Sequence, residues 1–117
     1  MSISNDSIDR IKLEVINCKL CNLCINRTNA VPGNGNPKAT IMFIGEAPGR
    51  NEDEKGKPFV GMAGKILDEA LAKVGLERSR IYVTNIVKCR PPSNRVPTEE
   101  ERRVCRSYLE REISIVS

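Results

Sequence analysis

Two apolar segments with an amphipathic helix between them constrain the fold of this chain more than any other feature. The run 39–44 (ATIMFI) ends at a glycine and is typical of a buried strand in a parallel sheet, and the β-branched run 79–87 (SRIYVTNIV) predicts a second strand. Residues 64–74 carry apolar side chains at helical spacing and stop at Gly75. This order predicts a right-handed βαβ unit, with functional loops gathered beyond the carboxyl ends of its strands.

The rest of the chain divides into two further helices and a loop. Residues 6–17 have the spacing of a short amphipathic helix, and residues 26–38 are rich in Asn, Pro and Gly, as surface loops are. Thr98 and Glu101 form a capping-box pattern that predicts a last helix ending at about Glu112. The final residues 113–116 (ISIV) predict the opening of another strand, so we expect one α/β domain with an incomplete sheet.

Composition favours a small protein without a membrane partner. The 117 residues are enough for one domain, and the apolar runs are too short to cross a bilayer. The first ten residues lack the order of a signal peptide, so we expect a cytoplasmic protein. The net charge is +4, and basic residues crowd the last third of the chain: Lys88, Arg90, Arg95, Arg102, Arg103 and Arg106. Such a cluster fits either the phosphates of a nucleic acid or a solvated charged surface.

Five cysteines and no histidine indicate a metal centre built from thiolates. Cys18, Cys21 and Cys24 form overlapping C-x-x-C pairs, and Cys89 and Cys105 follow with fifteen residues between them. Four of these thiolates can hold either zinc or a 4Fe-4S cluster. The second pair is not another C-x-x-C, which favours iron-sulfur over a zinc ribbon, and the spacing leaves open which cysteine of the first three is spare.

A glycine-rich loop directly after the first predicted strand is a candidate ligand-binding segment. Residues 45–53 (GEAPGRNED) would let backbone amides approach a ligand closely, but they have neither the lysine of a P-loop nor the spacing of a dinucleotide fingerprint. Glu46, Glu52 and Asp53 could orient water or stabilise a cationic transition state. Acidic residues in such a loop are also common on ordinary surfaces.

Two further side chains have unusual positions for their type. Phe59 lies among prolines and glycines, where its ring could stack on a base turned out of a duplex or fill the space between the loop and the core. Asn85 lies inside an otherwise apolar strand. Its carboxamide offers a donor and an acceptor together, which matches the pairing edge of a pyrimidine.

These motifs together resemble one family. The first C-x-x-C, VPGNGNP, GEAPGRNED, KPFVGMAG, TNIVKCRPPSNRVPTEEE and the last cysteine occur in the same order as in the family 4 uracil-DNA glycosylases, the iron-sulfur branch of that superfamily, from about Asn17 to Cys105. The resemblance implies a three-layer αβα fold with a parallel sheet. It also implies a DNA-repair enzyme that hydrolyses the N-glycosidic bond of deoxyuridine, with uracil-containing DNA as its partner.

The resemblance also implies roles for particular residues. The ligands of a structural 4Fe-4S cluster would be Cys18, Cys21, Cys89 and Cys105, with Cys24 as an extra thiol. The loop residues Gly45, Glu46 and Ala47 would hold uracil and position water. Phe59 would stack on uracil and Asn85 would read its edge, while Glu52 matches an acidic position near the active site. The loop from Arg90 to Arg95 would face DNA phosphates.

One departure separates this chain from the family pattern. The family continues with further strands and a His-Pro motif whose histidine contacts the uracil carbonyl, and this chain has no histidine. We therefore expect residues 1–117 to form an incomplete domain, in which residues 17–38 are the cluster-binding and loop segment. The competing interpretations are a metal-stapled nucleic-acid-binding module without catalysis and a redox iron-sulfur protein.

Overall fold

The computed structural model describes residues 6–20 and 23–116. Two single turns of 3-10 helix, at Arg78–Arg80 and Pro92–Asn94, accompany the longer elements. The elements are α1 (Ile8–Ile16), α2 (Leu23–Asn26), β1 (Asn34–Gly35), β2 (Met42–Gly45), α3 (Arg50–Lys55), α4 (Met62–Lys73), β3 (Tyr82–Asn85) and α5 (Glu99–Val116).

The sheet contains the predicted βαβ unit. Its described strands are ordered β1-β3-β2, and β2 is parallel to β3, with Met42 opposite Tyr82 and Gly45 opposite Asn85. Helix α4 lies between these strands in the chain, so the predicted order of strand, helix and strand is confirmed. The two-residue β1, antiparallel to β3, falls within the segment predicted to be a loop. The register places the carboxyl ends of β2 and β3 side by side, where the candidate loops begin.

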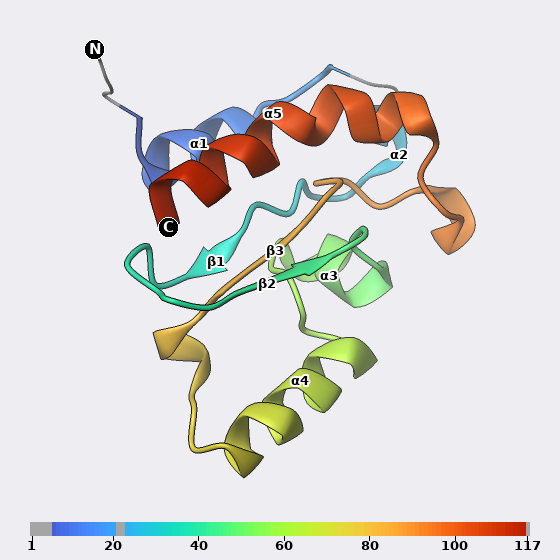
Figure 1. Cartoon of the computed structure of the whole chain (residues 1–117). Coiled ribbons are helices and arrows are strands. Elements are labelled where there is room, and N and C mark those ends of the chain that lie inside the picture. The colour runs from blue at the N-terminus through green and yellow to red at the C-terminus, as the bar shows by residue number, and fades with distance from the viewer. Residues whose placement is uncertain (1–5, 21–22, 117) are drawn as a thin grey trace.

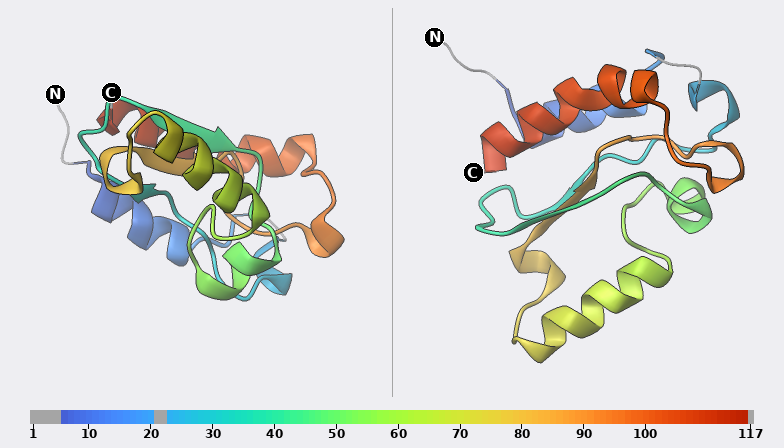
Figure 2. Two further views of the ribbon diagram at one scale, coloured as in Figure 1. Left: turned by 90° about the horizontal axis from the view of Figure 1, so that it is seen from below. Right: turned by 45° about the vertical axis from the view of Figure 1, so that its right-hand side comes forward.

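Helices cover both faces of this sheet, which confirms the three-layer arrangement. Helices α1 and α5 lie on one face, and α3 and α4 lie on the other (Figures 1 and 2). Successive residues of β3 alternate between the layers, since Tyr82 packs with the core of α1 and α5 and Val83 packs with Leu67 and Leu71 of α4. Asn85 lies two residues after Val83, so its side chain is on the same face of the sheet as Val83.

The outer surface of α4 differs from the sequence prediction. Leu67 and Leu71 are buried, but Ile66 and Val74 of the same predicted apolar face are 62% and 69% exposed. On the neighbouring edge strand β2, Ile44 is 45% exposed. The apolar stripe of α4 is therefore wider than the surface that three short strands offer to it.

The last helix begins as predicted and ends later. The Thr98 hydroxyl accepts a hydrogen bond from the Glu101 amide (3.1 Å), and the Glu101 carboxylate accepts one from the Thr98 amide (2.9 Å), so the capping box is confirmed. The predicted strand at residues 113–116 is wrong, because α5 continues to Val116, which is buried one helical turn after Glu112 in the core shared with α1. No helix among the described residues is both long and apolar enough to span a membrane.

Candidate functional site at the carboxyl ends of β2 and β3

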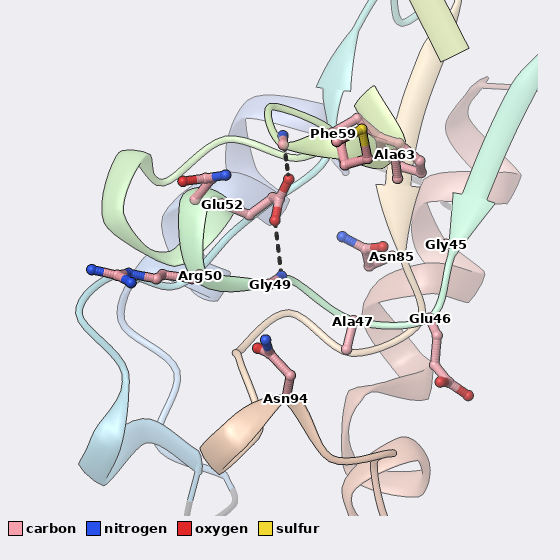
Figure 3. Close-up of a pocket in the computed structure, with 13 residues that line it drawn as sticks. Gly45, Glu46, Ala47, Gly49, Arg50, Glu52, Phe59, Ala63, Asn85 and Asn94 are labelled. Carbon is pink, nitrogen blue, oxygen red and sulfur yellow. Dashed lines mark hydrogen bonds between the residues drawn. The ribbon is translucent and has the colours of Figure 1, made fainter. Parts of the chain in front are cut away.

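A pocket of about 450 Å³ opens where β2 and β3 end (Figure 3). This volume lies in the range of small-molecule binding sites. The pocket brings together every residue that the sequence analysis connected with uracil, and it adds several others. Its lining consists of Gly45, Glu46, Ala47, Gly49, Arg50, Asn51, Glu52, Phe59, Gly61, Met62, Ala63, Asn85 and Asn94.

The floor of the pocket depends on a close approach at Gly45. A Cβ atom added to Gly45 would lie 2.4 Å from Asn85 Oδ1 and 3.1 Å from Phe59 Cζ. Only glycine therefore allows the amide and the ring to lie against the end of β2. The Asn85 residue is 5% exposed, and its carboxamide points into the pocket (Figure 3).

Phe59 is held in an unusual backbone conformation. Its φ is 54°, in the left-handed region that a bulky side chain rarely adopts. The Phe59 carbonyl accepts a hydrogen bond from the Arg78 guanidinium, and a Cβ on Gly64 would lie 2.0 Å from that carbonyl oxygen. The half-buried ring lines the pocket and also packs against the α4 core, so both arrangements considered for it from the sequence are present at once. Strained residues held in this way concentrate at binding sites.

Glu52 connects the two loops that form the pocket. Its carboxylate accepts hydrogen bonds from the amides of Gly49 (2.9 Å), Val60 (3.0 Å) and Gly61 (2.8 Å). Burial on its own raises the pKa of Glu52, but these backbone hydrogen bonds outweigh burial and lower the pKa below its usual value. Both oxygens of the carboxylate are thus engaged by the chain itself.

The neighbouring residue of α3 holds a third segment. Asp53 is 4% exposed, and its carboxylate accepts hydrogen bonds from the amides of Thr28 (2.9 Å) and Asn29 (3.2 Å). The Asn29 side chain in turn donates to the backbone carbonyl of Asp53 (2.9 Å). This short helix therefore connects the pocket to the segment that follows the first cysteines.

Glu46 lines the pocket mainly through its backbone. Its side chain is half-exposed and points away from Asn85 (Figure 3). The carboxylate accepts a hydrogen bond from Arg102 Nη2 of α5 at 2.9 Å. In this arrangement the Glu46 carboxylate is paired outside the pocket.

Lys88 does not belong to the exposed basic cluster. It is 1% exposed, and its ammonium donates to Glu112 Oε1 (2.6 Å), to the Thr84 hydroxyl (2.6 Å) and to the backbone carbonyl of Asn85. Burial lowers the pKa of Lys88, and Glu112 opposes this effect. The expectation that Lys88 offers a donor to phosphates is wrong, because the side chain is buried in an ion pair.

The partner of Lys88 was missed from the sequence although a signal for it was present. Glu112 is fully buried and also accepts a hydrogen bond from the Tyr82 hydroxyl (2.7 Å). It falls at helical spacing with the buried Cys105, Tyr108 and Val116. A charged residue at such a position predicts a buried partner.

Several arginines of the last third are also paired. Arg95 binds Glu101 through two nitrogens, each 2.8 Å from a carboxylate oxygen, and Arg103 pairs with Glu100. Arg90 donates to Asn94 Oδ1 (2.8 Å). The loop from Arg90 to Arg95 thus reaches the pocket rim through Asn94, which sequence reasoning missed because nothing local marks it as a lining residue.

Four cysteines line a second, much smaller cavity between the segment after α1, the segment after β3 and helix α5. They are Cys18, Cys24, Cys89 and Cys105, and Arg27 and Lys88 line the same cavity. Cys21 lies outside the described residues. Within residues 6–20 and 23–116, no three His, Cys, Asp or Glu side chains form a group that could hold a metal. The donor chemistry still fits a thiolate-bound iron or zinc centre.

Comparisons with known proteins lead to the same superfamily as the sequence motifs. The family model of the uracil DNA glycosylase superfamily matches residues 32–117. A type-4 uracil-DNA glycosylase of Sulfurisphaera tokodaii is 58% identical over 112 residues, which are 95% of this chain and 51% of that protein. A type-4 enzyme of Thermotoga maritima is 44% identical over 117 residues, or 61% of its length. A type-5 enzyme of Thermus thermophilus is 36% identical over 100 residues, 74% of this chain and 45% of the relative.

The chain spans about half the length of the type-4 relative from Sulfurisphaera tokodaii. The matched part contains both walls of the pocket, from the loop after β2 to the loop after β3. The relatives at 44% and 58% identity are type-4 proteins. Because the superfamily model covers well over half of the sequence, this chain belongs to the uracil DNA glycosylase superfamily.

Proposed function

We propose that this chain forms the uracil-binding part of a uracil-DNA glycosylase, which hydrolyses the N-glycosidic bond of deoxyuridine in DNA. The observation that carries the proposal is the close approach of Asn85 and Phe59 over Gly45. An aromatic ring and a carboxamide with a donor and an acceptor meet there at the edge of one pocket. A flat base with an amide edge suits this combination.

In the proposed reaction, uracil turns out of the DNA stack and enters the pocket. Its ring lies on Phe59, the Asn85 Nδ2 donates to uracil O4, and Asn85 Oδ1 accepts from uracil N3–H. The bond between C1′ and N1 then breaks, and its electron pair leaves with uracil as an anion. Water adds to the oxocarbenium-like sugar, and the proton that this water loses neutralises the uracil anion. Donors aimed at the uracil oxygens stabilise the departing anion.

Glu46 and Glu52 are given different tasks in this proposal. Glu46 would orient the attacking water, which requires its carboxylate to exchange Arg102 for that water. Glu52 would act as a positioning residue, because both of its oxygens already accept backbone hydrogen bonds. It would hold the Phe59 loop against the loop after β2.

The proposed metal centre uses Cys18, Cys21, Cys89 and Cys105 to hold a 4Fe-4S cluster, with zinc as the alternative. When bound, the cluster would supply a structural cross-link among the N-terminal segment, the segment after β3 and α5. Three of the four proposed ligands line one cavity, which supports this assignment. The presence of Cys24 on the same cavity makes the choice between Cys21 and Cys24 a matter for experiment.

Uracil-containing DNA is the proposed partner. Arg90 and Arg95 lie in the loop that reaches the pocket rim through Asn94, and they would contact phosphates on either side of the turned-out base. Because Arg95 pairs with Glu101, its contact with a phosphate would replace or share that ion pair. Binding through such contacts weakens as salt is raised.

Two measurements test the proposal. The first is binding of the chain to an oligonucleotide with one non-cleavable deoxyuridine analogue, against the same oligonucleotide with thymidine. Asn85→Asp should remove the preference, because the new oxygen repels uracil O4 at a cost of about 1 to 3 kcal/mol or more. Asn36→Asp is the matched control, since its Oδ1 accepts a hydrogen bond from the Lys38 amide and aspartate preserves that acceptor. An unchanged preference in Asn85→Asp would refute the assigned role.

The second measurement is uracil release from single-stranded DNA, with the Sulfurisphaera tokodaii relative as the positive control. We expect the 117-residue chain to be at least about a thousandfold slower, because it has no histidine to stabilise the charge on the uracil oxygen. Small misplacements in the pocket would add to this loss. Selective binding without release would identify a binding module, and robust release would show that the catalytic groups have been misplaced.

A further inference from the structure

Arg27 occupies a position in the cysteine cavity that the proposed function does not use. It follows α2 directly, and its guanidinium lies partly buried on the cavity wall. One nitrogen, Nη1, lies 2.9 Å from Cys89 Sγ and donates to it. The other, Nη2, donates to the backbone carbonyl of Ile16 at the end of α1 (3.2 Å). The side chain therefore bridges the segment that carries the first cysteines and the cysteine that follows β3.

The charge environment of Arg27 suits a partner made of thiolates. Its Nη1 donates to Cys89 Sγ, and Cys18, Cys24 and Cys105 line the same cavity. The other cation on the cavity wall, Lys88, is already paired with Glu112. Arg27 is thus directed at sulfur, whereas Lys88 is directed at a carboxylate.

We propose that Arg27 is a positioning residue of the metal centre, which donates to the Cys89 sulfur and balances the negative charge of the thiolates. This inference rests on the proposed cluster. A donor to a ligand sulfur disfavours loss of the metal, and a cation beside an iron-sulfur cluster raises its reduction potential. The hydrogen bond to the Ile16 carbonyl helps to orient the guanidinium toward the Cys89 sulfur.

A different reading gives Arg27 a purely structural role, in which it ties α1 to the segment after β3 whether or not metal is present. The two roles differ in whether the positive charge of Arg27 affects the bound metal centre. A structural tie predicts that replacements of Arg27 change metal retention only as far as they change the stability of the metal-free chain. The proposed role predicts a change in the properties of the bound centre itself.

The test uses the 117-residue chain purified without oxygen. Three replacements separate the two features of the side chain: Arg27→Lys keeps the charge, Arg27→Gln keeps a donor without the charge, and Arg27→Met removes both. Arg80→Met is the matched control, because Arg80 is an exposed arginine of the 3-10 turn before β3 and does not line the cysteine cavity. Metal per chain, the rate of metal loss to a chelator, the reduction potential and the thermal stability of the metal-free chain are measured for each.

We expect Arg27→Met to lose metal about 10- to 100-fold faster than the unmodified chain, as removal of an outer partner of a metal ligand commonly does. The reduction potential should fall in Arg27→Met and Arg27→Gln and stay closer to the original in Arg27→Lys. Arg80→Met should change neither quantity. If Arg27→Met does not fold, the comparison of Arg27→Lys with Arg27→Gln still separates charge from donation.

Two negative results have different meanings. An unmodified chain that binds neither iron nor zinc would overturn the proposed metal centre and this inference with it. A metal-loaded chain whose Arg27 variants match Arg80→Met, or whose metal loss follows only the stability of the metal-free chain, would overturn the role of Arg27 alone. A zinc-loaded chain would be tested by the rate of zinc loss, and equal rates in Arg27→Lys and Arg27→Gln would contradict the balance of charge.

Discussion

The pocket at the carboxyl ends of β2 and β3 and the cavity lined by the cysteines lie at the same end of β3, but they are organised in different ways. The pocket is formed by the chain itself: Glu52 holds its two loops together, and Gly45 lets Asn85 and Phe59 meet. In the cavity, the described cysteines share a wall without forming a group that could hold a metal. Hydrogen bonds within the chain thus hold the first site together, whereas the proposed metal would set the final arrangement of the cysteines in the second.

The two regions share a short stretch of backbone. Asn85 belongs to the pocket, Cys89 belongs to the cavity, and the buried Lys88 between them donates to the Asn85 carbonyl. Glu112 of α5 holds Lys88 in place. Because the two regions share this stretch, a replacement in one of them can affect the other.

Removal of a proposed metal ligand should have the largest effect. We expect the chain purified without oxygen to be brown with about four irons, and Cys89→Ser to contain none, because a cubane cluster is held by four thiolates. Cys24→Ser is the matched replacement and should keep its iron. Iron and acid-labile sulfide analysis measures both. A colourless chain with one zinc would contradict the iron assignment. Loss of iron in Cys24→Ser would mean that Cys24, and not Cys21, is a ligand.

Breaking the buried ion pair should affect both regions. Glu112→Gln leaves the Lys88 ammonium buried without its carboxylate, and we expect the free energy of unfolding to fall by roughly 3 to 5 kcal/mol. The double replacement Lys88→Met with Glu112→Gln should recover part of this loss, since an acceptor remains for the Tyr82 hydroxyl. Urea unfolding measures the stability, and deoxyuridine binding and metal content are followed in parallel.

Exposed Glu110 provides the control for this replacement, because Glu110→Gln changes the same helix without touching the ion pair. If deoxyuridine binding and metal content both fall in Glu112→Gln, the two regions are coupled through Lys88. If one property changes and the other does not, the two regions are independent.

The smallest effect is expected at the start of α5, beside the loop of Arg95. The pKa of Glu101 is lowered from its ordinary value of 4.5 to about 2, mainly by the hydrogen bonds from Arg95. A lowered pKa in the folded chain stabilises it above about pH 4.5, and this contribution is lost as the pH falls toward 2. Arg95 is 39% exposed, so solvent screening limits the contribution to on the order of 1 kcal/mol.

Glu101→Gln should therefore be less stable than the unmodified chain at neutral pH, and the difference should vanish near pH 2. Urea unfolding across this range measures it, and Glu99→Gln, at an exposed position of the same first turn, is the control. A difference that persists in acid would mean that the hydrogen bonds of the capping box, rather than its charge, provide the stability.

The parts of the fold that were predicted correctly depend on local patterns. A continuous apolar run, a β-branched run and a helical stripe were enough for the βαβ unit. Thr98 with Glu101 marked the start of α5 without any knowledge of distant contacts. The segment 113–116 was assigned wrongly because Ile and Val suit a strand as well as a buried helix face. Its state was decided by packing against α1, which no local pattern reports.

The candidate site divides in the same way. Gly45 and Asn85 could be expected near one another because the carboxyl ends of neighbouring parallel strands converge, whereas Phe59 was added by the family resemblance. The pairing of Lys88 with Glu112, of Glu46 with Arg102 and of Asp53 with the Thr28 amide joins residues far apart in sequence. The roles of Gly45, Phe59 and Asn85 in binding stay predictions, as does the role of Glu46 in catalysis.

Helix α3 gives the molecule a form of thermodynamic linkage. Two consecutive acids of this six-residue helix hold different segments, since Glu52 binds the loop after Phe59 and Asp53 binds the segment after Arg27. If a ligand orders one of these segments, we expect it to restrict α3 and so to reduce the entropy that the other segment loses on binding. Occupation of the cysteine cavity should then strengthen capture of the base, and capture of the base should strengthen retention of the metal by the same factor.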